Sequence, residues 1–322
     1  MKLSILDQSP VIGTLGASRA IAETIALARR ADELGYHRYW LAEHHAIAAL
    51  ADPCPEVLLA RLGAETRRLR IGSGGVLLPY YSAFRTAESF RMLEALYPGR
   101  IDLGIGRAPG GDQRTALAVG GGRFPDAAHF PQQVADLAAL LEEKSLPIRL
   151  QPEVDTVPEV WLLGSSDYSG ALAAELGLPF AFAHFINPRG GDVVAREYRD
   201  KFKSTGKKQP RVMVCTFAII AESDDEAERL AAPIDLRRLH MALNIDSPVP
   251  TPEEAAKHRY SDEERRYVLS QRPRAVIGGP QKARRELQEM VERYGADELM
   301  VLTITGDYDS RRRSYELLID AF

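Results

Sequence analysis

The sequence has few of the features that mark secreted or metal-binding proteins. Only two of its 322 residues are cysteines, Cys54 and Cys215, and their spacing fits neither a disulfide framework nor a metal motif. We therefore expect free thiols in a reducing, cytoplasmic setting. The amino-terminal segment lacks the apolar stretch and the cleavage site of a secretory signal peptide, which agrees with that expectation.

Long apolar runs and a surplus of positive charge are also absent. Charged residues and glycines interrupt every apolar run before it reaches the roughly 18 to 20 residues of a membrane span. The net charge of −4 gives no overall basic field for nucleic acid or for anionic lipids. We therefore expect neither a nucleic acid nor a membrane as a partner. The hydrophobic fraction of 45% is enough for a large core.

Short apolar runs alternate with helix-like segments along the chain. The predicted strands are 3–6, 38–42, 69–79, 100–106, 159–164, 179–185, 211–221 and 298–306. Helical patterns near 18–34, 55–67, 83–96, 131–143, 168–176, 190–204 and 279–295 separate most of them, and Gly35, Gly177 and Gly295 are stop signals. Apolar strands flanked by helices are typical of a buried parallel sheet. Eight such units predict an α/β fold, a (β/α)8 TIM barrel that forms a single domain over residues 1–322.

The connection between the last two predicted strands is too long for one simple crossover. A charged helix is predicted to start near Asp224. Residues 235–278, where Pro, Arg and Glu cluster, are predicted to form a mobile insertion.

Polar residues at the ends of the strands are the candidates for a site, because the active site of such a barrel lies at the carboxyl ends of its strands. After the fifth strand, the sequence LGSSDYSG opens a helix, where free N–H groups and serine hydroxyls can bind a phosphate. Arg107 follows the fourth strand and can add a positive charge. A plain N-cap role for Ser166 or Asp167 is the alternative, and IGGP (277–280), at the start of another helix, is a rival anion site.

The third predicted strand contains Ser73-Gly74-Gly75 within an apolar run. Glycine weakens a strand and usually marks a bulge or a close approach of another backbone. A flat ligand can lie against such a bare stretch, while a simple packing kink is the alternative.

Glu43-His44-His45 follows the second predicted strand. Adjacent histidines on an extended chain point in opposite directions, and no motif supplies a third ligand, so a metal pair is not expected. A general acid or base at the strand end is one interpretation, and a capping or surface histidine is the other.

Four segments resemble signatures of the luciferase-like monooxygenases, flavin-dependent barrel enzymes that include bacterial luciferase and alkanesulfonate monooxygenase. These segments are LSILDQSPV, LGYHRYWLAEHH, RIGSGGVLLPYYSAFRTAESFRMLEALYPGRIDLGIGRAPGGD and GADELMVLT. They occur in the family order, and together with the intervening chain the resemblance covers essentially the whole sequence. The long central segment is the most specific of the four.

The resemblance implies a site for reduced FMN at the mouth of the barrel. In the family a separate NAD(P)H-dependent reductase supplies the reduced FMN, and dioxygen then oxygenates an organic substrate. His44 matches the active-site histidine of bacterial luciferase, and Arg107 matches the arginine that pairs with the FMN phosphate. The other predicted cofactor-binding residues are Ser73, Gly74, Gly75, Gly106, Gly164, Ser165, Ser166, Tyr168 and Ser169. The resemblance also favours the loop after the fifth strand as the phosphate site.

Two local features follow from the same resemblance. Family members carry a non-prolyl cis peptide under the flavin ring, which we expect near Gly74-Gly75. His44 is expected to face the flavin, and His45 to face away from it. Gly106 stands where luciferase has a reactive cysteine, so light emission is not implied.

The leading prediction is therefore an FMN-dependent monooxygenase for a small or medium apolar substrate, for which Tyr80, Tyr81 and Phe185 can line a pocket. A deazaflavin-dependent hydride-transfer enzyme and a flavin-binding protein without catalysis are the alternatives. The resemblance also suggests a homodimer through the helices beside the second and third strands.

Overall fold

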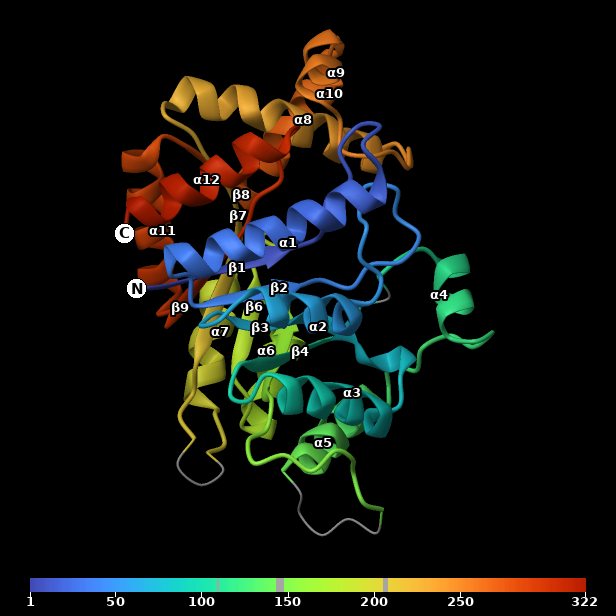
Figure 1. The fold of residues 1–322 in the computed structure, drawn as a ribbon. Helices are drawn as coiled ribbons and strands as arrows, with labels where there is room; N and C mark the ends of the chain where they lie inside the picture. The colour runs from blue at the N-terminus through green and yellow to red at the C-terminus, as the bar shows by residue number, and fades with distance from the viewer. Residues whose placement is uncertain (109, 143–147, 205–207) are drawn as a thin grey trace.

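The computed structural model describes residues 1–108, 110–142, 148–204 and 208–322, which form a sheet surrounded by helices (Figure 1). The strands are β1 (Lys2–Asp7), β2 (Arg38–Leu41), β3 (Arg70–Leu77), β4 (Ile101–Gly106), β5 (Glu159–Gly164), β6 (Phe180–Ala183), β7 (Val212–Ile220), β8 (Ala275–Gly278) and β9 (Glu298–Leu302). The α-helices are α1 (Gly16–Leu34), α2 (Pro55–Glu65), α3 (Ala83–Leu96), α4 (Gln113–Val119), α5 (Phe130–Leu141), α6 (Asp167–Leu176), α7 (Gly191–Asp200), α8 (Asp224–Ala242), α9 (Pro252–Lys257), α10 (Asp262–Gln271), α11 (Pro280–Tyr294) and α12 (Tyr308–Asp320). Two short 3-10 helices are η1 (Leu78–Tyr80) and η2 (Arg272–Arg274).

Eight of the strands close into a barrel in which neighbouring strands are parallel. Their order is β6-β5-β4-β3-β2-β1-β9-β7, and the pairing of β6 with β7 completes the ring. The remaining strand, β8, pairs with residues 217–220 at the carboxyl end of β7 and lies beside the ring. The predicted (β/α)8 TIM barrel is confirmed, and the last predicted strand corresponds to β9.

The helix ends follow the local sequence signals. Gly35, Gly177 and Gly295 each adopt a left-handed backbone conformation after α1, α6 and α11, and their N–H groups donate to carbonyls of the preceding turn. These are the three glycines that the sequence predicted as helix stops, and the left-handed conformation is the reason that glycine suits them. Sharp stops return the chain promptly to the next strand of the barrel.

The segment between β7 and β9 holds secondary structure that the sequence analysis missed. Helix α8 continues to Ala242, beyond the predicted boundary at residue 235. Helices α9 and α10 each begin with a capping box, in which Thr251 or Ser261 exchanges hydrogen bonds with a glutamate three residues later. The interpretation of residues 235–278 as a mobile insertion overlooked these caps and the four residues of β8.

A buried cluster of charges closes the amino-terminal end of the barrel. The Arg38 guanidinium on β2 bonds Asp102 on β4 at 2.8 Å, Glu298 on β9 at 2.7 Å and Glu159 on β5 at 3.1 Å. Its side chain is only 2% exposed. Burial alone would lower the pKa of Arg38, but the three carboxylates raise that pKa above its ordinary value, so that the guanidinium stays charged.

Two tryptophans lie next to this cluster. Trp40 follows Arg38 by two residues on β2, and Trp161 follows Glu159 by two residues on β5. The indole N–H of Trp40 donates to Asp102 at 2.9 Å, and that of Trp161 donates to Glu159 at 2.7 Å. The rings meet edge to face with their centroids 5.7 Å apart. The Arg38 guanidinium lies 4.9 Å from the Trp161 ring centroid, so that the charge cluster and the tryptophans form one packed unit across the barrel.

Among the described residues, no helix combines the length and the apolar character that crossing a membrane requires.

Arg38→Met tests how much the charge cluster stabilises the barrel. The variant keeps much of the side-chain volume but leaves Asp102 and Glu298 buried without their cation. We expect the free energy of unfolding in urea to fall by about 3–5 kcal/mol, the usual cost of removing one partner from a buried ion pair. Arg61→Met, which removes an exposed ion pair with Glu65, is the control and should change stability little. Similar losses in both variants would show that the cluster has no special role.

Glu159 should give this cluster a measurable pH dependence. Burial alone would raise the pKa of Glu159, but hydrogen bonding and attraction from Arg211 and Arg38 lower it from 4.5 to about 2. A lowered folded-state pKa stabilises the fold above the unfolded value and loses that effect as the pH falls toward the folded value. Glu159→Gln should therefore be less stable than wild type by about 1–3 kcal/mol near pH 7, and this difference should shrink below about pH 5. A difference that stays constant down to about pH 3 would contradict the assignment.

Candidate functional site

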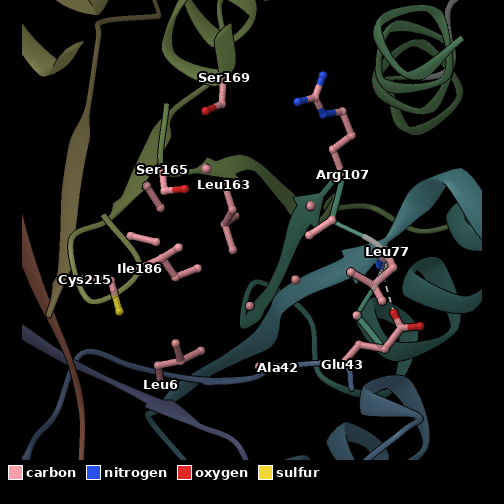
Figure 2. A pocket seen from close by; sticks show the side chains of 18 of the residues that line it. Leu6, Ala42, Glu43, Leu77, Arg107, Leu163, Ser165, Ser169, Ile186 and Cys215 are labelled. Carbon is pink, nitrogen blue, oxygen red and sulfur yellow. Dashed lines mark hydrogen bonds between the residues drawn. The ribbon is translucent and has the colours of Figure 1, made fainter. Parts of the chain in front are cut away.

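A cavity of about 290 Å³ lies at the carboxyl ends of the barrel strands (Figure 2). Its floor consists of apolar side chains that point into the barrel, among them Leu6, Trp40, Ala181, Cys215 and Met300. The residues nearer the mouth are Gln8, Ala42, Glu43, His44, Gly74, Gly75, Leu77, Gly106, Arg107, Ala108, Gly110, Phe130, Leu163, Gly164, Ser165, Ser166, Tyr168, Ser169, Ala183, Phe185 and Ile186. The cavity is therefore apolar below and polar at its rim.

One wall of the cavity is formed by backbone, because glycines of β3 and β4 approach each other closely. A Cβ atom on Gly75 would lie 2.8 Å from the carbonyl oxygen of Gly104, and one on Gly104 would lie 2.2 Å from that of Ser73. The strand register shifts between Ser73 and Val76, and the Gly74-Gly75 peptide is cis, as the family resemblance implied. The wall leaves room for a flat group against bare backbone.

Ser73 does not line the cavity, although it was among the predicted cofactor-binding residues. Its hydroxyl is buried and donates to the Gly104 carbonyl at 2.9 Å. The bulge in β3 turns Gly74 and Gly75 toward the cavity and leaves Ser73 to hold the two strands together. The other predicted site residues all line the cavity.

The start of α6 places polar groups at one side of the cavity, where the Ser166 and Ser169 hydroxyls lie 3.4 Å apart and the Tyr168 N–H donates to the Asp167 carboxylate at 2.8 Å. Ser166 is the N-cap residue, but its side chain makes no capping hydrogen bond. The Ser169 hydroxyl donates to the Ser166 carbonyl at 2.9 Å. A Cβ atom on Gly164 would lie 2.0 Å from the Ser169 oxygen, so that only glycine lets this helix start so close to β5. The Ser166 side chain therefore does not cap the helix, contrary to the plain N-cap interpretation.

Arg107 extends into the same region from the end of β4. Figure 2 shows its side chain and that of Ser169 on one side of the cavity, with Leu6 and Ala42 across from them. The Arg107 guanidinium lies 4.2 Å from the ring centroid of Tyr168, the second residue of α6. Among the described residues no carboxylate pairs with it, so its charge is available to an anion.

The rival anion site at residues 277–280 is already filled by the protein. The N–H group of Gly279, at the start of α11, donates to the Asp224 carboxylate at 2.6 Å. A carboxylate at this helix start takes the place that an anionic ligand would need.

The chain after β2 is held by Glu43, a residue that the sequence analysis noted without assigning it a role. Its buried carboxylate accepts the Leu77 N–H at 2.9 Å and the Tyr81 hydroxyl at 2.6 Å. It also contacts the ring nitrogen Nε2 of His45 at 2.7 Å. His45 is therefore occupied with Glu43 and does not line the cavity.

His44 lines the cavity, in contrast to its neighbour. Its Nδ1 atom is buried and has no hydrogen-bond partner among the described residues. Burial is the largest cause that lowers the pKa of His44 below its ordinary value of 6.5. The ring is therefore neutral at neutral pH and can accept a proton.

Of the aromatic residues suggested for a substrate pocket, only Phe185 lines the cavity. Tyr81 instead donates its hydroxyl to Glu43, and Tyr80 lies outside the lining. The residues of the cavity floor were not among those predicted from the sequence to belong to the site. Side chains along a strand point alternately to its two faces. Leu6 lies two residues after Ser4, and Trp40 two residues after Arg38, so this alternation would have placed both inside the barrel.

The described part of the chain contains no group of three or more His, Cys, Asp or Glu side chains arranged to hold a metal ion.

Comparison with known proteins gives close matches over nearly the whole chain. A family model for luciferase-like monooxygenases matches residues 1–298. The Bacillus subtilis protein YwcH is 42% identical, and the match covers 100% of this chain and 99% of that protein. An Escherichia coli (strain K12) luciferase-like monooxygenase is 39% identical over 98% of this chain and 96% of its own length. The N-acetyl-S-alkylcysteine monooxygenase of B. subtilis is 32% identical over 100% of this chain and 98% of its own length.

Solved structures share the fold. That of apo-MsnO8 superimposes with a TM-score of 0.94 at 39% identity, covering 100% of this chain and 98% of the other. The oxygenating constituent of a 3,6-diketocamphane monooxygenase, solved with FMN, matches with a TM-score of 0.73 at 18% identity over 100% and 97%. An F420-dependent secondary alcohol dehydrogenase matches with a TM-score of 0.64 at 14% identity over 99% and 98%. The chain belongs to the luciferase-like monooxygenases, an enzyme family of oxidoreductases.

Proposed function

We propose that this protein is an FMN-dependent monooxygenase that uses reduced FMN and dioxygen to oxygenate a small or medium apolar organic molecule. The observation that carries the proposal is the pairing of an anion-binding rim with a flat backbone wall in one cavity. Arg107 and the start of α6 form the rim, and Gly74-Gly75 form the wall.

The phosphate of FMN fits the polar side of the cavity. Arg107 has no carboxylate partner among the described residues, and the hydroxyl of Ser166 makes no capping bond. The first N–H groups of a helix have no carbonyl partner within it, and Gly164 allows α6 to start close to the strand. The Tyr168 N–H donates instead to the Asp167 carboxylate at 2.8 Å. Ser165, Tyr168 and Ser169 complete this side.

The flavin ring fits the rest of the cavity. Its flat face can lie against the Gly74-Gly75 backbone, where any Cβ atom would collide with neighbouring atoms. Leu6, Trp40 and Met300 form an apolar floor below it. Such a floor excludes water from the reacting face, which protects reactive species from side reactions.

The chain's own chemistry is limited to binding, orientation and proton transfer. Bound reduced FMN supplies the electrons with which dioxygen is activated and one of its oxygen atoms is transferred to the substrate. His44 is the titratable side chain placed to assist, because it lines the cavity and its Nδ1 atom has no partner among the described residues. As a neutral imidazole it can take up a proton from a reacting group and return it.

Two partners belong to this proposal. Reduced FMN would come from a separate NAD(P)H-dependent reductase, as the family resemblance implies. A homodimer is supported by exposed apolar side chains on α2 and α3, where Val57 is 70%, Met92 54% and Leu96 53% exposed. These helices lie beside β2 and β3, the region expected for the dimer contact.

A deazaflavin-dependent hydride transfer is the second candidate. It is supported by the F420-dependent dehydrogenase that shares the fold. The two candidates differ in their need for oxygen, because hydride transfer consumes none.

Isotope labelling separates the two functions. The protein would be loaded anaerobically with reduced FMN, mixed with ¹⁸O-labelled dioxygen and N-acetyl-S-propylcysteine, and the product analysed by mass spectrometry. The thioether is chosen because one relative is named for monooxygenation of N-acetyl-S-alkylcysteine. A product carrying one labelled oxygen supports the monooxygenase. Binding of F420 without measurable affinity for FMN would overturn it.

Arg107→Ala tests the phosphate contact. Loss of a charge-assisted hydrogen bond should weaken FMN binding by about 1.5–3 kcal/mol, measured by quenching of flavin fluorescence. Arg114→Ala, which removes an exposed arginine on α4 outside the cavity lining, should bind FMN like wild type. Unchanged affinity in Arg107→Ala would remove this residue from the site.

His44→Ala tests the proposed proton transfer. We expect turnover to fall by about 100-fold or more, the usual loss with a general acid or base, while FMN affinity changes little. His45→Ala is the matched comparison, because that histidine lies outside the cavity lining and should retain most activity. A fully active His44→Ala variant would mean that the ring has only a structural role.

A further inference from the structure

Cys215 on β7 lies across the cavity from the glycine wall of β3. Three strands separate β3 from β7 in either direction around the closed ring, so these two strands face each other. Gly74, Gly75 and Cys215 all line the cavity. Figure 2 shows Cys215 and Leu77, the last residue of β3, at opposite sides of it. The side of the cavity that faces the bare backbone therefore includes Cys215.

Short, uncharged side chains make up this side of the cavity. Ala183 on β6 pairs in register with Cys215, and Ala181 lines the cavity from the same strand. Met300 is the partner of Cys215 on β9 and also lines the cavity. The Cys215 residue is 5% exposed, and burial raises the pKa of its thiol, which therefore stays uncharged. Two alanines and a thiol leave room that longer side chains would fill.

The turn after β6 carries apolar side chains at the rim above these residues. The Phe185 N–H donates to the Cys215 carbonyl at 3.3 Å, and the Ile186 N–H donates to the Ala183 carbonyl at 3.1 Å. Both Phe185 and Ile186 line the cavity, and Ile186 is 52% exposed. The rim at Arg107, by contrast, is polar. The mouth therefore has one polar side and one apolar side, and an apolar ligand fits the second.

The proposed FMN site leaves only one face of the flavin ring open to a substrate. The backbone of Gly74-Gly75 would cover the other face, and the phosphate would occupy the polar side at Arg107. Because β3 and β7 face each other, the open face of the ring is turned toward Cys215. A substrate that reaches this face therefore lies between the ring and the side chains of β6 and β7.

We propose that Cys215 and Ala183 determine the length of the apolar chain that the substrate can carry. The chain enters beside Ile186 and ends against these two short side chains. The inference rests on the proposed monooxygenase function and names its substrate class, molecules with a slim, unbranched alkyl chain. None of the side chains on this side of the cavity carries a strong hydrogen-bonding group, so an alkyl chain loses no polar contact there.

A series of probes that differ only in chain length tests the inference. Methyl n-alkyl sulfides from propyl to nonyl would be titrated by calorimetry into protein loaded with reduced FMN, without oxygen so that no turnover occurs. We expect wild-type affinity to rise about three- to fourfold with each methylene and to stop rising once the chain reaches Cys215. Leucine is longer than cysteine, so in Cys215→Leu the rise should end about two methylene groups earlier, with short chains unaffected.

Further variants separate a change in pocket length from a general loss of structure. Cys215→Ala should extend the rise by about one methylene group, the opposite of the effect of Cys215→Leu. Ala183→Val should shorten it in the same way as Cys215→Leu. Cys54→Leu makes the same substitution at an exposed cysteine outside the cavity lining and should keep the wild-type dependence on length. Thermal unfolding would verify that each variant folds.

The outcomes distinguish this inference from the proposed function. A rise that ends at the same length in wild type and in both Cys215 variants would overturn it. So would an equal loss of affinity at every length in Cys215→Leu, or a wild type that binds none of the sulfides. FMN affinity should be unchanged in these variants. A protein without affinity for FMN would refute the proposed function instead, whereas the same length series, measured without flavin, would still support or overturn the role of Cys215.

Discussion

The buried contact of Arg38 with Asp102, Glu159 and Glu298 is the constraint on which the site depends. One guanidinium links four of the eight barrel strands at their amino-terminal end. Because a buried charge tolerates little displacement from its partners, the contact holds the relative heights of those strands. Trp40 donates a hydrogen bond to Asp102 of this cluster and also lines the cavity. The floor of the site is thereby tied to the most strongly held part of the barrel.

Above this floor, glycines decide the shape of the cavity. The close approach of β3 and β4 leaves no room for a Cβ atom on Gly75 or Gly104. A Cβ atom on Gly164 would likewise collide with Ser169 at the start of α6. Backbone therefore forms two sides of the space. The cavity combines a polar rim that carries Arg107 with an apolar floor, which is the division that a phosphorylated aromatic cofactor requires.

The sequence predicted the barrel well, because parallel strands are short apolar runs and glycine stops mark the helix ends. It missed β8, since four residues of mixed pattern acquire strand structure only by pairing with β7. Residues at the strand ends were also predictable, because the fold gathers them at one mouth. Ser73 lies outside the cavity lining, because the bulge in β3 shifts the alternation of side chains in a way that spacing does not reveal. The contact of Glu43 with His45, and that of Asp246 with Ala48 in the loop after β2, depend on tertiary packing alone.

The most direct test of this account is a crystal structure of the protein with FMN. The account predicts the phosphate against Arg107 and the first turn of α6, and the flavin ring against Gly74-Gly75 with His44 beside it. A phosphate bound elsewhere on the barrel, or a ring that does not contact the Gly74-Gly75 backbone, would contradict it.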